Sequence, residues 1–80
     1  MLGKQKPTPV DAFGFVLRRE RKARNLSQEA LALEAEVQRN YVSLMELGRN
    51  QPTVTVIFKL AKALGIKPSK LIQMVDDELA

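Results

Sequence analysis

Four side chains near the middle of the chain have the chemistry that reads DNA bases. Arginine can donate two parallel hydrogen bonds to guanine, asparagine can form two with adenine, and serine or leucine can touch the methyl group of thymine. These residues are Arg39, Asn40, Ser43 and Leu44. Helical spacing puts them on the outward face of a helix expected from about Arg39 to Leu47, which predicts base reading in the major groove. The alternative is an ordinary solvent-exposed face.

A second, shorter helix must hold that face outward. Ser27 can cap a helix over about residues 28–35, and only a few residues separate this helix from the next. Some side chains are expected to face inward. They are Leu31, Ala32 and Ala35 on helix 28–35, Val37 in the turn, and Val42 and Met45 on helix 39–47. Because Ala32 is small, it allows the two helices to cross in close contact.

The whole chain reads as five helices without a strand, which predicts an all-α bundle. Pro7 and Pro9 keep residues 1–10 extended as a flexible arm, and residues 11–80 form one DNA-binding domain. The expected helices run from the cap Asp11 to Arg24, over 28–35, over 39–47, from the cap Thr53 to Gly65, and from Pro68 to the end. The apolar positions of the fourth helix are Val54, Ile57, Leu60, Ala61 and Leu64.

Composition excludes several classes of function. The chain has 80 residues, of which 45% are hydrophobic, and it has no Cys and no His. Disulfides, thiol or imidazole catalysis and the usual zinc ligands are therefore excluded, and we expect no metal, no cofactor and no enzymatic activity. No run approaches the ~20 apolar residues of a membrane span, and the first residues do not resemble a signal peptide, so we expect a cytoplasmic protein.

The net charge of +4 is unevenly distributed. Residues 18–24 carry five basic side chains against one acidic one, whereas the acidic residues gather on the expected helix 28–35 and at the end of the chain. Such polarity suits attraction of a phosphate backbone. The alternative is that the basic run only solvates the back of the first helix.

The order and spacing of residues along most of the chain resemble the phage repressor and Cro (Xre-like) type of helix-turn-helix domain. The residues that carry the resemblance are Gly14, Leu17, Arg18, Arg21, Leu26, Ser27, Gln28, Glu29, Leu31, Ala32, Tyr41, Val42, Ser43, Glu46, Gly48, Pro52, Leu60, Ala61 and Leu64. The stretch RNYVS at 39–43 resembles restriction-modification controller proteins in particular. The resemblance implies a lambda-repressor-like fold and binding to double-stranded DNA.

The resemblance also implies roles for single residues. Arg39, Asn40, Ser43 and Leu44 match positions that face the groove, and Gln28 matches one that holds a phosphate at a helix start. The other phosphate-contacting residues expected are Gln38, Tyr41, Arg49 and Asn50. Arg21 and Glu46 match a structural ion pair between the first and third helices.

Two residues depart from the family pattern. Glu36 stands at a turn position that is usually Gly, because the backbone there is left-handed, and this costs about 1 kcal/mol. Leu47 replaces the usual polar or basic residue before Gly48, so we expect either the loss of one phosphate contact or an apolar contact in its place.

A small core favours a homodimer, because a second copy buries further apolar surface. We predict a symmetric interface that contains Phe58, Ile72, Val75 and Leu79, and hence a palindromic operator. The sequence thus predicts a sequence-specific transcriptional regulator, of repressor or controller type. The alternative is a protein-binding module on the same fold, such as an antitoxin or an adaptor, with an unknown protein partner.

Overall fold

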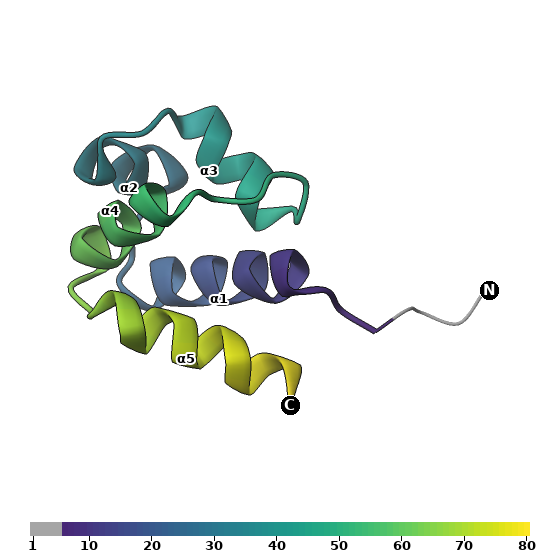
Figure 1. Cartoon of the computed structure of the whole chain (residues 1–80). Coiled ribbons are helices and arrows are strands. Elements are labelled where there is room, and N and C mark those ends of the chain that lie inside the picture. Colours follow the sequence, from purple (N-terminus) through teal and green to yellow (C-terminus); the bar gives the residue numbers. More distant parts are fainter. Residues whose placement is uncertain (1–5) are drawn as a thin grey trace.

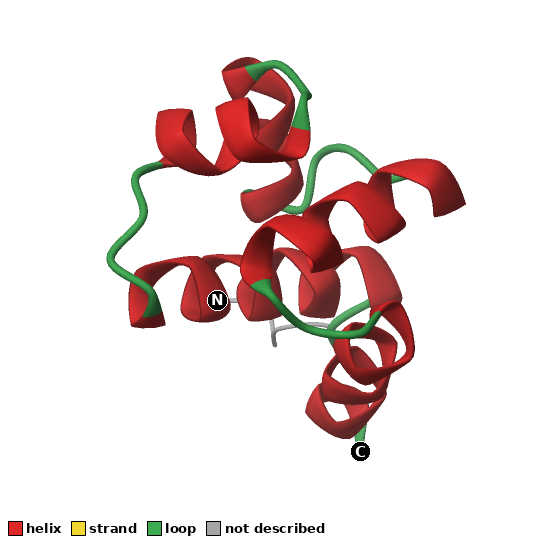
Figure 2. Ribbon diagram, turned by 90° about the vertical axis from the view of Figure 1, so that its left-hand side faces the viewer, coloured by secondary structure: helices red, strands yellow, loops and turns green. Residues whose placement is uncertain are grey.

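The computed structural model describes residues 6–80, and within them the chain forms five α-helices and no strand. Figure 2 shows only helices and loops in this part of the chain. The helices are α1 (Pro9–Ala23), α2 (Gln28–Ala35), α3 (Arg39–Glu46), α4 (Val54–Leu64) and α5 (Pro68–Leu79). The predicted all-α, five-helix architecture is confirmed.

The first helix begins earlier than its sequence indicates. Asp11 was the expected cap, but Thr8 caps α1 and Asp11 is the third helical residue. The Thr8 hydroxyl oxygen accepts from the Asp11 backbone N–H at 3.2 Å, and the Asp11 carboxylate accepts from the Thr8 backbone N–H at 3.0 Å. Pro9 fits the first helical position, where its missing N–H costs nothing. The prediction of an extended arm over residues 1–10 is therefore wrong at its carboxyl end, because α1 already begins at Pro9. Residues 1–5 of the predicted arm lie outside the described residues.

The remaining helix ends follow the predicted caps closely. The hydroxyl oxygens of Ser27 and Thr53 accept from backbone N–H groups in the first turns of α2 and α4. Asn25, after α1, has a left-handed backbone with φ of 56°. α3 ends at Glu46, one residue before the predicted end. Local sequence therefore sets most of the boundaries.

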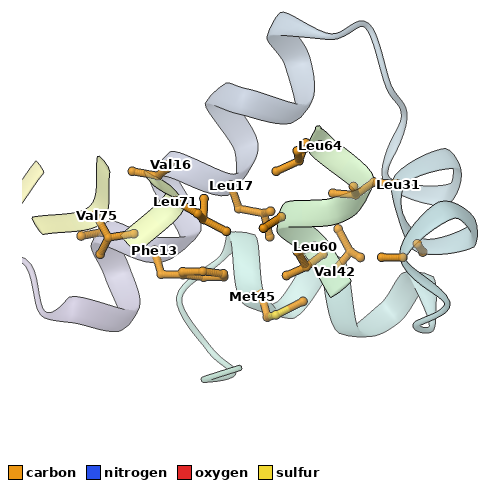
Figure 3. Packing of buried hydrophobic residues seen from close by; sticks show 14 residues of the cluster. Phe13, Val16, Leu17, Leu31, Val42, Met45, Leu60, Leu64, Leu71 and Val75 are labelled. Carbon is orange, nitrogen blue, oxygen red and sulfur yellow. The ribbon is translucent and has the colours of Figure 1, made fainter. Parts of the chain in front are cut away.

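The five helices enclose one apolar core, seen in Figure 3. α1 contacts α3 and α5, while α2 packs on α3 and α4. In Figure 1, α5 lies on the side of α1 opposite to the α2–α3 pair. Val54 was expected in the inward stripe of α4, but its side chain is 70% exposed, because it sits at the first turn on the outer side. No helix among residues 6–80 has both the length and the apolar character needed to cross a membrane.

Gly14 lies at a close contact between α1 and the last turn of α3. A Cβ atom at this position would collide with the backbone carbonyl oxygen of Met45 and lie 2.9 Å from that of Glu46. Only glycine therefore lets the α1 backbone approach the last turn of α3 this closely. This contact fixes the carboxyl end of the helix that carries the candidate base-reading residues.

Candidate nucleic-acid interface

The turn between α2 and α3 begins with a residue whose backbone is left-handed, and this residue ends α2. Glu36 has φ of 59° and ψ of 43°, so it takes up the backbone conformation that glycine usually provides at this position. The Val37 N–H then donates to the Ala32 carbonyl oxygen at 2.9 Å, and the Val37 side chain packs against the core. Burial of Val37 and this hydrogen bond offset the roughly 1 kcal/mol cost of a left-handed Glu36.

α3 has one buried face and one outward face. Val42 and Met45 are fully buried, whereas Arg39 and Asn40 are exposed and Ser43 and Leu44 are half-buried. Residues three and four apart are neighbours on a helix, so the structure brings the four predicted base-reading residues onto one accessible surface. The exposed Leu47 continues this surface at the helix end. We call the five side chains the α3 face.

A buried hydrogen-bond network holds α3 against α1 and α2. Arg21 donates to both carboxylate oxygens of Glu46, with Nε–Oε2 of 2.7 Å and Nη2–Oε1 of 2.9 Å. Its third donor group reaches the Leu26 carbonyl oxygen at 2.8 Å. The hydrogen bond to Glu46 raises the pKa of Arg21 above its usual value, although burial acts against it. The ion pair that the resemblance implies is therefore present as a two-pronged contact between α1 and α3.

Gln28 joins this network, which the sequence did not indicate. Its side-chain Nε2 donates to Glu46 Oε1 at 3.0 Å, so the residue expected to hold a phosphate is tied to the far end of α3. In the first turn of α2 the Ala30 N–H donates to the Ser27 hydroxyl, whereas the N–H groups of Gln28 and Glu29 precede the first hydrogen bond within the helix. The phosphate role of Gln28 stays a prediction.

The other predicted phosphate contacts surround the α3 face. Gln38 precedes α3 and its side chain makes no capping hydrogen bond, while Arg49 and Asn50 are exposed in the loop after α3. Tyr41 packs against the core, and its hydroxyl donates to the Gln51 carbonyl oxygen at 3.5 Å, the limit for a hydrogen bond. Tyr41 therefore links α3 to the following loop.

Much of the basic run on α1 is occupied within the chain. Arg24 donates to the Glu20 carboxylate at 2.9 Å and to the Leu64 carbonyl oxygen at 2.6 Å, where it caps the end of α4. Arg19 contacts Glu20 at 3.2 Å and Glu78 at 3.1 Å. The hydrogen bond from Arg24 holds the pKa of Glu20 below its usual value. Fewer basic side chains of residues 18–24 are therefore left to attract DNA than the sequence suggested.

The predicted dimer residues do not share one environment. Phe58, Ile72 and Leu79 are 57%, 45% and 38% exposed, in agreement with an outward apolar surface. Val75 is only 8% exposed and belongs to the core of the monomer. It follows Leu71 by one helical turn, so it faces α1 rather than solvent. We therefore remove Val75 from the proposed contact surface.

Comparisons with known proteins agree with this geometry. The family model for helix-turn-helix domains matches residues 17–71. The chain is 39% identical over 61 residues to the control protein C.BamHI of Bacillus amyloliquefaciens, and the match covers 75% of each chain.

Solved structures give the same result. The restriction-modification controller protein C.AhdI from Aeromonas hydrophila is 42% identical with a TM-score of 0.75, over 78% of this chain and 94% of that one. The controller protein C.Esp1396I, solved as a tetramer in complex with its natural 35 base-pair operator, shares the fold at 22% identity. Its TM-score is 0.81, over 89% of this chain and 93% of that one. The chain therefore belongs to the helix-turn-helix family of DNA-binding transcriptional regulators, in the Xre-like group that includes restriction-modification controller proteins.

Proposed function

We propose that this protein is a controller-type transcriptional regulator that binds a palindromic operator as a homodimer. The observation that carries the proposal is the α3 face, where Arg39 and Asn40 stand exposed on a helix anchored by the buried Val42 and Met45. A helix held in this way can enter the major groove and present its side chains to base edges. The controller proteins C.BamHI and C.AhdI, both more than a third identical, support this assignment.

In the proposed mechanism the protein acts in the cytoplasm by occupying its operator DNA, and no catalytic step is involved. Arg39 and Asn40 discriminate between bases, with Ser43 and Leu44 contacting thymine methyl groups. Gln28, Gln38, Tyr41, Arg49 and Asn50 hold phosphates on both sides of the groove. Because phosphate contacts release counterions, the logarithm of the binding constant falls linearly with the logarithm of the salt concentration.

Selection of bound DNA from a random pool tests the proposal directly. The wild-type protein should enrich one sequence motif with two-fold symmetry, whose half-sites are centred about 34 Å apart, one helical turn. Recovery of unrelated sequences with equal affinity would show non-specific binding and contradict base reading by α3. A motif without symmetry would contradict the homodimer but leave base reading in place.

Substitution of an exposed apolar residue tests the dimer. We expect Ile72→Asp to raise the monomer fraction in sedimentation velocity, because a charge would enter the apolar surface formed with Phe58 and Leu79. The far-ultraviolet circular dichroism of the variant should match that of wild type, since Ile72 is 45% exposed in the monomer and its replacement leaves the core intact. The matched control is Leu33→Asp, which places the same charge at an exposed apolar residue of α2, away from α4 and α5. A dimer that persists unchanged in Ile72→Asp would exclude this surface.

A further inference from the structure

The two ends of the α3 face differ in chemistry. The amino end carries the hydrogen-bonding groups of Arg39 and Asn40, whereas the carboxyl end carries the wholly apolar side chains of two leucines, Leu44 and Leu47. Leu47 caps α3 but keeps its helical path, with φ of −84° and ψ of −2°, and its N–H donates to the Ser43 carbonyl oxygen at 3.1 Å. Its side chain therefore lies one helical turn beyond Ser43, on the side of α3 that carries the predicted base-reading residues.

Leu47 has no part in the apolar core. Its side chain is 61% exposed, and among residues 6–80 it is not one of the side chains that pack against the core. The proposed dimer surface lies on α4 and α5, whereas α3 packs on α1 and α2. Neither the packing of the monomer nor the proposed dimer therefore accounts for a leucine at this position.

The backbone is held in place on both sides of Leu47. The preceding residue, Glu46, has a side chain that is 2% exposed and is bound by Arg21. The following residue, Gly48, has φ of 73°, and a Cβ atom there would lie 2.6 Å from Oδ1 of Asp11, so Gly48 sits close against α1. The Leu47 side chain therefore has a defined position at the end of the α3 face, as a contact with a base edge requires.

Base edges in the major groove present hydrogen-bond donors and acceptors, together with one apolar group, the C5-methyl of thymine. The base 5-methylcytosine carries the same methyl group at the same ring position. A phosphate is a poor neighbour for a leucine, because the apolar side chain displaces water from the charge without replacing its hydrogen bonds. The chemistry of Leu47 therefore fits a methylated pyrimidine better than the DNA backbone.

Resting on the proposed binding of operator DNA by the α3 face, we propose that Leu47 is a specificity-determining residue that contacts the C5-methyl group of a pyrimidine. The contact recognises the methyl group and not the base that carries it. It therefore adds the same affinity to thymine over deoxyuridine as to 5-methylcytosine over cytosine. Where a cytosine occupies this base pair, operator binding depends on methylation of that cytosine.

Operators that differ by one methyl group test the proposal. In the motif that the wild-type protein selects, each thymine of a half-site is replaced in turn by deoxyuridine, and each cytosine by 5-methylcytosine. At the base pair that Leu47 contacts, loss of the thymine methyl group should raise the dissociation constant about fourfold in competition binding, the value of one buried methyl group. Cytosine and 5-methylcytosine placed at this base pair should differ by the same factor, in favour of the methylated base.

Leu47→Ala assigns the effect to this side chain. The variant should reduce both differences at that base pair to less than about twofold, because most of the apolar contact is removed. Its far-ultraviolet circular dichroism should match that of wild type, since Leu47 is exposed. The matched control is Leu33→Ala, at a leucine of α2 that is 79% exposed, and it should keep both differences.

Two results would overturn the role of Leu47 while base reading by the α3 face still stands. One is a selected motif in which no methyl group affects affinity. The other is a methyl effect that persists undiminished at every base pair in Leu47→Ala. Failure to select any motif would instead overturn the proposed function and the methyl contact together.

Discussion

Replacing Glu46 with alanine is expected to lower the free energy of unfolding by about 3–5 kcal/mol, the largest stability effect predicted for this protein. Glu46 and Arg21 are 2% and 9% exposed at their side chains, so water cannot replace the lost carboxylate. Arg21 stays charged and loses two hydrogen bonds, and Gln28 loses its acceptor. A small domain is stable by only about 5–15 kcal/mol, so this loss leaves it marginal.

Urea unfolding at fixed protein concentration measures this effect, because dimerisation makes the apparent stability depend on concentration. Glu34→Ala, at an exposed glutamate of α2, is the matched control and should change the free energy by less than about 0.5 kcal/mol. The double variant Arg21→Met with Glu46→Leu should lose less than Glu46→Ala, since it leaves no unpaired buried charge. A loss below about 1 kcal/mol in Glu46→Ala would show that the network contributes little.

Arg39→Ala is expected to cause the largest change in DNA recognition. Its guanidinium lies exposed at the first position of α3 and forms no ion pair within residues 6–80, so it is free to contact guanine. Loss of a bidentate contact should remove about 1–3 kcal/mol of discrimination at one base pair of each half-site. Competition binding with operators that differ only at that base pair measures the loss.

Arg49→Ala supplies the matched comparison, because Arg49 is an exposed arginine in the loop after α3. As a phosphate contact it should weaken binding to all sequences alike and reduce the salt slope by about 1 per site. If Arg39→Ala instead weakened every sequence equally, Arg39 would be a phosphate contact and its assignment to base reading would be wrong.

The helices were predictable because their signals are local. Ser27, Thr53 and Gly65 act through hydrogen bonds or backbone angles within a few residues of themselves, and the structure uses each as expected. The start of α1 was missed for a related reason. Both Thr8 and Asp11 can cap a helix, and the two form one capping box in which the earlier residue is the cap.

The long-range polar contacts were only partly predictable. The Arg21–Glu46 pair could be inferred from its resemblance to a known family, but the Gln28–Glu46 and Arg24–Leu64 contacts join residues 18 and 40 positions apart. Sequence periodicity describes one helix at a time. It shows which side chains lie on the same face of a helix, but it does not show which atoms of another helix they contact.

The division between surface and core shows the same limit. Periodicity placed Val75 on the same apolar side of α5 as Ile72 and Leu79, and the structure buries the first and exposes the other two. The position of α1 beside α5 decides which of these neighbours is covered.

The amino-acid sequence by itself determined the five helices, their caps, the left-handed turn at Glu36 and the outward position of Arg39 and Asn40, because each depends on residues close in the chain. Only the tertiary structure decided that Glu46 accepts hydrogen bonds from both Arg21 and Gln28, that α1 approaches α3 closely at Gly14, and which apolar residues remain on the surface. These features depend on the packing of helices against one another, since burial and hydrogen-bond partners are set by neighbours that are distant in sequence.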